Sequence, residues 1–276
     1  MKSPKKVLIM GDSVSVGVGD SGANFEGLGW GMRIAEMIEA DRSLNIAENG
    51  AKVADFQLRQ SQIVHSFRPD LVVVSVGSND ILRSSFNAKR IFSQLHESFQ
   101  KISKVCCTVL LLVPPDPLHF APAPKFLRQA LSLRHQQLLQ VFKLLEENEL
   151  VKLVLVTPEE VAHQKNLWHI DRMHPSPIGH QYLAMKSLQC LEIYPKRILE
   201  IEDEGRNLKQ KIFWLLIAGS MWFLKRSVDL IPSLIWLGIK FRYFHRFKDD
   251  TFLDLLGRSR ILETVPSSNF KNSNFN

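Results

Sequence analysis

The chain has 276 residues, of which 45% are hydrophobic and 23% charged, a composition that excludes a disordered or fibrous protein. Its three cysteines have neither the number of a disulfide framework nor the spacing of a zinc site. The net charge of +7 is uneven, because residues 1–195 carry 21 Lys and Arg against 19 Asp and Glu, whereas residues 196–276 carry 14 against 9.

Short apolar runs alternate with longer segments of helical periodicity as far as residue 194. The runs predict strands at residues 7–10, 44–48, 70–77, 106–113 and 151–156. The longer segments predict helices near residues 31–41, 54–64, 88–104, 126–149 and 176–194. This order is typical of a parallel sheet with helices on both faces, so we expect a three-layer α/β/α domain over residues 1–195. Ligands of such domains bind at the carboxyl ends of the strands.

The first strand ends in "GDSV", residues 11–14, and two interpretations of the following glycines compete. Residues 17–22, "GVGDSG", match the glycine pattern of dinucleotide-binding oxidoreductases. That pattern must start where the strand ends, and here it starts seven residues later and leads into a loop, so it is disfavoured. In the other interpretation, Gly11 permits a sharp turn and Ser13 presents its hydroxyl as a nucleophile, which needs a base and oxyanion donors.

The other strand ends supply groups of that chemistry. Gly50, in "ENG", follows the second strand and allows a backbone N–H to approach a ligand closely. Asn79, in "VGSND", follows the third strand and carries an amide donor. After the fifth strand, Asp171 and His174 lie three residues apart in "DRMHPSP". This spacing lets the carboxylate bind one imidazole nitrogen while the other faces Ser13.

These segments resemble the four sequence blocks of the SGNH (GDSL-type) hydrolases. In chain order, they are "GDSV", the glycine of "ENG", "GSND" and "DRMH". The segments "VGSNDILR" and "HPSPIGH" are most similar to the bacterial GDSL-like lipase/acylhydrolase branch, and the resemblance covers residues 5–195. It implies the flavodoxin-like SGNH fold with a five-stranded parallel sheet. It also implies a serine esterase, of the lipase/esterase type, that cleaves carboxylic esters through an acyl-enzyme. Membrane association of the C-terminal third would bring the triad near lipid esters and would fit a lysophospholipase-like role.

The resemblance also implies roles for individual residues. Ser13 would be the nucleophile and His174 the general base, oriented by Asp171. The backbone N–H groups of Ser13 and Gly50 and the side-chain amide of Asn79 would form the oxyanion hole. Loops at the strand ends are expected to wall the acyl pocket, with apolar surface from Phe25, Trp30, Leu118 and Phe120.

Two other interpretations of these blocks stay open. The segment "HIDRMH" suggests metal ligands in His169, Asp171 and His174, but no second histidine–carboxylate cluster completes such a site, and we expect neither a metal nor a cofactor. A degenerate domain of the same family would instead serve as a membrane-recruited binding module.

Residues 196–263 form a basic, apolar extension that we expect to be helical, followed by a polar tail, residues 264–276, that we expect to be disordered. In the most apolar part, residues 211–248, a single membrane span would bury three charged residues at roughly 2.5–3.5 kcal/mol each. We therefore expect either short helices lying in an anionic membrane surface or a hairpin packed on the domain or a partner subunit.

No nucleic-acid partner is expected, and the oligomeric state is not predicted. The apolar run at residues 7–10 is too short for the core of a signal peptide. We therefore expect a cytoplasmic protein, peripheral at the inner face of the membrane if the extension binds lipid.

Overall fold

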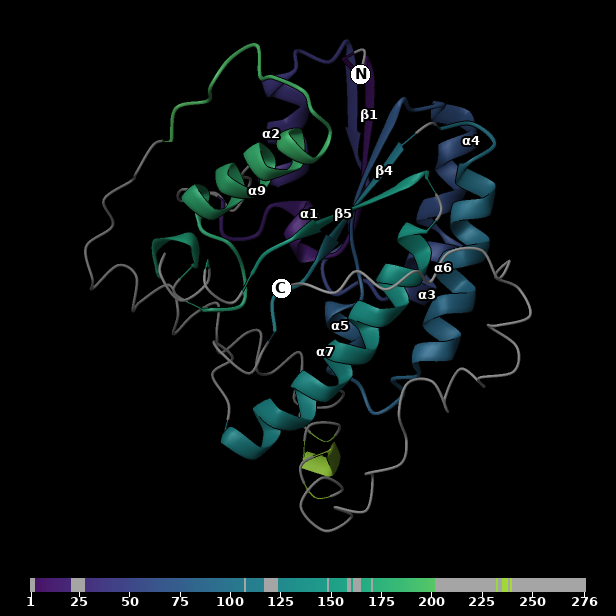
Figure 1. The fold of residues 1–276 in the computed structure, drawn as a ribbon, viewed down its shortest axis with the longest axis vertical. Coiled ribbons are helices and arrows are strands. Elements are labelled where there is room, and N and C mark those ends of the chain that lie inside the picture. Colours follow the sequence, from purple (N-terminus) through teal and green to yellow (C-terminus); the bar gives the residue numbers. More distant parts are fainter. Residues whose placement is uncertain are drawn as a thin grey trace, which may run out of the picture.

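Five parallel strands form one sheet in the described part of the chain, in the order β2-β1-β3-β4-β5 (Figure 1). They are β1 (Lys6–Gly11), β2 (Arg42–Asn45), β3 (Leu71–Ser75), β4 (Thr108–Val113) and β5 (Val151–Leu155). The structure is a computed structural model that describes residues 3–20, 28–106, 108–116, 124–147, 149–157, 160, 165–169, 171–201, 232, 235–237 and 239. The predicted α/β fold with a five-stranded parallel sheet is confirmed.

Helices follow the strands in chain order. The longer ones are α2 (Gly29–Met37), α3 (Val53–Leu58), α6 (Ala88–Ile102), α7 (Lys125–Glu146) and α9 (Pro177–Cys190). The short ones are α1 (Ser13–Val16), η1 (Gln60–Ile63), α4 (Val64–Phe67), α5 (Ser78–Ile81) and η2 (Lys165–Leu167). Neither α1 nor α5 was expected from the sequence, and each begins within three residues of the end of a central strand.

Alternate residues of β1 supply the two cores of the domain. Val7 and Ile9 lie in the cluster that α2 and α9 cover, whereas Leu8 and Met10 lie in the cluster that α3, α6 and α7 cover. Figure 1 shows these two helical layers on opposite sides of the sheet. All residues of β3 and β4 are buried, as expected for strands covered on both faces.

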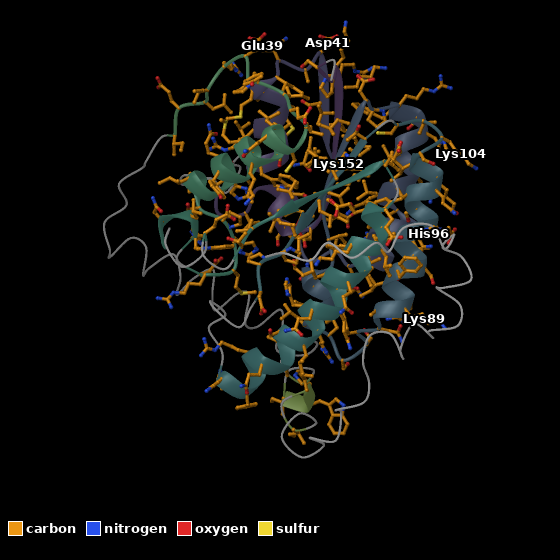
Figure 2. All side chains as sticks on the ribbon, in the orientation of Figure 1. Glu39, Asp41, Lys89, His96, Lys104 and Lys152 are labelled. Atoms are coloured by element: carbon orange, nitrogen blue, oxygen red, sulfur yellow. The ribbon has the colours of Figure 1, made fainter. Side chains whose placement is uncertain are left out.

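Helix α6 shows how the sequence pattern produces one of these layers. The Asn87 side chain caps the helix by accepting a hydrogen bond from Arg90 N at 2.8 Å. Buried side chains recur three or four residues apart, at Ala88, Ile91, Leu95, Phe99 and Ile102. Lys89 and His96 lie on the outer side of the helix, away from the sheet (Figure 2).

The segment predicted as one helix over residues 54–64 is broken in the structure into α3, η1 and α4. The break occurs where Gln60 turns inward. Its side-chain amide accepts a hydrogen bond from Gly11 N at 2.6 Å and donates one to Gly11 O at 3.0 Å. The buried N–H of Gly11, at the end of β1, thus gains a partner and its carbonyl a further donor, at the expense of helical regularity.

The described residues of the C-terminal extension lie in two places. Lys196 N donates to Met37 O at the end of α2, whereas Leu237 lies against the amino-terminal half of α7. Leu237 is buried in a small cluster with Ala130 and Leu131, and Leu82 and Leu127 pack against the cluster. Within the described residues, no helix is long and apolar enough to cross a bilayer. The tail at residues 264–276 and most of the predicted extension lie outside the described residues.

Candidate active site

Ser13 stands at the corner between β1 and α1, as the sequence predicts. Gly11, with a φ of 118°, makes this turn, and a Cβ there would lie 1.9 Å from Ser75 O, so only glycine fits. Asp12 N donates to Ser75 O at 2.8 Å. The Asp12 carboxylate caps α1, accepting hydrogen bonds from Val14 N at 3.1 Å and from Ser75 Oγ at 2.9 Å. Ser13 therefore begins a helix whose first turn is held to the neighbouring strand.

Two carboxyl groups lie near this corner, the buried Asp12 and the half-buried Asp80, which interact electrostatically. Burial raises the pKa of Asp12 to about 6, although the hydrogen bonds from Ser75 and Val14 act in the opposite direction. Burial also raises the pKa of Asp80 to about 6, and Asp80 Oδ2 accepts a hydrogen bond from Val53 N at 3.0 Å.

The structure brings Ser13, His174 and Asp171 together in one hydrogen-bonded line. The His174 ring lies between the other two, with Nε2 at 2.9 Å from Ser13 Oγ and Nδ1 at 2.8 Å from Asp171 Oδ2. Burial alone raises the pKa of Asp171, but the side chains of His169 and His174 outweigh it and hold that pKa well below its usual range. Because an ionised carboxylate only accepts hydrogen bonds, Nδ1 carries the proton in the neutral ring, and Nε2 accepts from the Ser13 hydroxyl.

The loop that carries Asp171 and His174 is folded tightly on itself. Asp171 Oδ1 accepts hydrogen bonds from the backbone N–H groups of Met173 at 2.8 Å and His174 at 3.1 Å. His169 N donates to His174 O at 2.9 Å, and His169 Nδ1 lies 3.4 Å from Asp171 Oδ2. Asp171 thus has two imidazoles beside it, a role for His169 that the sequence interpretation missed. The motif "HIDRMH" offered the only signal for it.

Gly19 holds the loop after α1 against the histidine loop. A Cβ at Gly19 would lie 2.2 Å from Pro175 O and 3.3 Å from His174 Cβ, and its φ is 93°. The two loops that carry the predicted triad therefore meet through direct backbone contact, which requires glycine at this position.

His180 and a buried ion pair support the same region, and sequence reasoning did not identify either. His180 is fully buried, its Nδ1 accepts from Trp30 N at 3.1 Å, and its Nε2 donates to Val18 O at 3.1 Å. Burial lowers the pKa of His180 to about 4. Arg33 holds both carboxylate oxygens of Asp20, at 2.9 and 2.6 Å. All these partners are distant in sequence, so no local pattern could reveal them.

The predicted oxyanion donors lie at the neighbouring strand ends. Glu48 N donates to Gly11 O at 2.9 Å, which places the turn containing Gly50 beside the Ser13 corner. Gly50 has a φ of 80°. Asn79 Nδ2 donates to Ala51 O at 3.1 Å, so one N–H of the amide is engaged at this turn and the second remains for a ligand. The Ser13 N–H begins α1 and therefore has no acceptor within that helix.

Of the four residues predicted to line the acyl pocket, only Trp30 lies in the described part of the chain. Trp30 is fully buried among the side chains of the α2–α9 core, where it packs rather than lining a pocket, so the structure corrects that prediction. Trp30 lies where α2 packs against α9, and its backbone N–H donates to His180 on α9. Phe25, Leu118 and Phe120 lie outside the described residues.

Solved structures share the fold of this chain. Axe2, an acetylxylan esterase from Geobacillus stearothermophilus, has a TM-score of 0.54 and 19% identity, over 71% of this chain and 100% of that chain. LAE5, an α/β hydrolase enzyme from the metagenome of Lake Arreo, Spain, has a TM-score of 0.52 and 22% identity, over 68% of this chain and 95% of that chain. Three Axe2 structures are described as catalytic mutants, in which a serine, an aspartate or a histidine is replaced by alanine.

No curated protein sequence matches this chain. The family model of the GDSL-like Lipase/Acylhydrolase family matches residues 9–182, which is more than half of the chain and includes every residue of the predicted triad and oxyanion hole. The chain therefore belongs to the GDSL-like lipase/acylhydrolase family and is a carboxylic ester hydrolase.

Proposed function

We propose that this protein hydrolyses its ester in two acyl-transfer steps, with Ser13 as the nucleophile and His174 as the general base. The observation that carries the proposal is the line of hydrogen bonds from Ser13 Oγ through His174 to Asp171, at 2.9 and 2.8 Å. A serine hydroxyl is a weak nucleophile unless a base lies within hydrogen-bond reach, and this arrangement meets that condition. The catalytic mutants described for Axe2 concern the same three residue types and support this assignment.

In the first step, Ser13 Oγ bonds to the carbonyl carbon of the ester while its proton moves to Nε2 of His174. Asp171 stabilises the resulting imidazolium by accepting the hydrogen bond from Nδ1. The negative charge on the former carbonyl oxygen is met by the N–H groups of Ser13 and Gly50 and by the amide of Asn79. The ester C–O bond then breaks, and the imidazolium returns its proton to the departing alcohol.

In the second step, a water molecule replaces the alcohol. His174 takes a proton from this water as the water oxygen bonds to the acyl carbon. The bond between the acyl carbon and Ser13 Oγ then breaks, and the serine oxygen recovers its proton from the imidazolium. The products are a carboxylic acid and the free enzyme.

Covalent labelling with a fluorophosphonate tests the serine assignment. Intact mass should show a single adduct on the native protein and none on Ser13→Ala. Ser15→Ala is the matched control, because Ser15 lies two residues further on, is buried, and accepts a hydrogen bond from Ser75 N at 3.2 Å. It should label as the native protein does. A folded native protein without an adduct would contradict the proposal and favour the non-catalytic binding module.

We also propose that the ester is a lipid, taken from an anionic membrane surface as by a lipase or lysophospholipase. Ile235, Trp236 and Ile239 expose 57%, 56% and 42% of their surfaces. These residues are helical, and their spacing places them on the side opposite Leu237, which is buried on α7. An exposed face with Trp and Ile between basic residues is typical of helices that lie in a membrane surface. The nearest basic residues in the sequence are Lys225, Arg226, Lys240 and Arg242.

Vesicle binding tests this second proposal. The native protein should sediment with phosphatidylcholine vesicles that contain about 30 mol% phosphatidylglycerol, and less with phosphatidylcholine alone. Trp236→Ser should weaken this binding, whereas Leu58→Ser, which changes an exposed apolar residue at the end of α3, should not. Both variants should hydrolyse water-soluble p-nitrophenyl acetate as the native protein does. Equal binding by Trp236→Ser would contradict the membrane proposal and leave the serine assignment intact.

A further inference from the structure

Helix α5 carries Asn79, yet it is a single turn, Ser78–Ile81. Such a helix is not stable alone, because helix nucleation is unfavourable and four residues form few hydrogen bonds. Its N-cap, Gly77, has a left-handed conformation with a φ of 102° and has no side chain to cap the helix. The orientation of Asn79 therefore depends on contacts that other elements make with the two ends of α5.

Arg134, on α7, holds the carboxyl end of α5. Its Nη1 donates to Ile81 O and to Arg83 O, both at 2.8 Å. A cation at this position is favourable, because the last carbonyl groups of a helix lack partners within it and carry partial negative charge. The guanidinium also lies over the Phe86 ring, 5.4 Å from its centroid. Burial lowers the pKa of Arg134 to about 10, so the group stays charged at neutral pH.

The same helix holds the amino end of α5. A Cβ at Gly77 would lie 2.9 Å from Leu138 Cδ2, so the backbone at Gly77 packs directly on the Leu138 side chain. Leu138 and Arg134 are four residues apart and lie on one face of α7. Helix α7 runs for 22 residues and is therefore a rigid support for both contacts.

We propose that Arg134 is a positioning residue for the oxyanion hole, because it fixes α5 and thereby directs the Asn79 amide toward the reacting oxygen. The inference rests on the proposed role of Asn79. Between its two ends, α5 meets the Gly50 turn through the bond from Asn79 Nδ2 to Ala51 O. Without Arg134, the carboxyl end of α5 loses both of its carbonyl contacts, whereas the bonds from Val53 N to Asp80 Oδ2 and from Asn79 Nδ2 to Ala51 O remain. The carboxyl end of α5 can then shift, and the amide can turn away from the oxyanion. Displacements of about 1 Å in such groups lower rates by up to about a hundredfold.

Kinetics of Arg134→Met with p-nitrophenyl acetate test the proposal. This variant keeps the apolar stem but loses the donors, and its kcat should fall about tenfold to a hundredfold while KM changes less than about twofold. Arg134→Lys keeps a cationic donor and should restore most of the kcat. Arg90→Met is the matched control, because Arg90 Nη2 also donates to a carbonyl that follows α5, Ser85 O at 2.8 Å, but from an exposed position. Its kcat should not change.

A double-mutant cycle separates positioning from general stability. In the Asn79→Ala background, Arg134→Met should change kcat by less than about twofold, because the group that Arg134 orients is already absent. The proposal would be overturned if Arg134→Met lowered kcat by the same factor in the native and Asn79→Ala backgrounds. It would also be overturned if folded Arg134→Met had an unchanged kcat. If Arg134→Met does not accumulate as folded protein, Arg134→Gln replaces it in the same double-mutant cycle. An Asn79→Ala variant with native kcat would refute the proposed oxyanion role itself, which is a separate outcome.

Discussion

Replacing the buried imidazole of His180 by the side chain of glutamine should change how stability depends on pH. In the folded protein, the His180 ring bridges Trp30 N and Val18 O without exposure to solvent. Burial disfavours its charged form, and the positive charge of Arg33 adds to this effect, so the pKa falls from 6.5 to about 4 despite the opposing charge of Asp20. The glutamine side chain offers an N–H donor and a carbonyl acceptor for these two partners but does not titrate.

The sign and size of the effect follow from this shift. As the pH falls from about 6.5 to about 4, the unfolded chain binds a proton at His180 that the folded protein does not bind. The contribution of the neutral ring to the free energy of unfolding is therefore fully present above pH 6.5 and is lost on acidification. The difference between the pKa values of the unfolded and folded states corresponds to about 3 kcal/mol. Other groups with shifted pKa values, namely Asp12, Asp80 and Asp171, titrate both in the native protein and in His180→Gln. Their contributions to the free energy of unfolding therefore largely cancel when the two proteins are compared.

Urea unfolding followed by circular dichroism, at several pH values between about 4 and 7, measures this quantity. The difference in unfolding free energy between the native protein and His180→Gln should fall by about 3 kcal/mol from pH 7 to pH 4. His65→Gln, which replaces an exposed imidazole on α4, is the control for loss of a histidine. A difference that stays constant across this range would refute the reasoning.

Three other predictions concern the catalytic centre and its supports. Asp171→Asn should lower kcat for p-nitrophenyl acetate by about three to four orders of magnitude, because an amide can donate to His174 and favour the wrong tautomer; a loss below about tenfold would contradict this. Gly19→Ala should lower kcat with little change in far-UV circular dichroism, since its Cβ would lie 2.2 Å from Pro175 O, and native kinetics would argue against that contact. Gln60→Ala should lower the free energy of unfolding by about 2–4 kcal/mol in urea titrations, because it removes two hydrogen bonds and leaves a buried N–H unpaired. A loss below about 1 kcal/mol would contradict this stabilising role.

The sheet and the proximity of Ser13, Asp171 and His174 were predictable because their signals are local. Runs such as residues 70–77 are apolar at most positions, which is typical of strands covered on both faces. Ser13 and Asn79 lie within four residues of the ends of β1 and β3, and parallel strands bring such positions to one edge of the sheet. Asp171 and His174 are close in sequence, so their hydrogen bond could also be anticipated.

The supporting contacts were not predictable because their partners are distant in sequence. Gln60 breaks a helix to reach Gly11, 49 residues away, and periodicity alone favoured an unbroken helix. Trp30 follows a glycine-rich loop, as a pocket residue would, but packing of α2 against α9 buries it. Arg134 has the pattern of an ordinary polar position on a long helix, and only the tertiary structure places it at the end of α5.

The bond between Ser13 and His174 joins residues 161 positions apart, near the two ends of the hydrolase domain. Closing a loop of this length lowers the entropy of the chain before the contact can stabilise it, and long-range contacts slow folding. The triad therefore assembles only after β1 and α9 have both docked on the sheet. During synthesis, the proposed nucleophile emerges long before the proposed base, so we expect esterase activity only when α9 has left the ribosome. In refolding, the return of activity accordingly marks the completion of the domain rather than the formation of its helices.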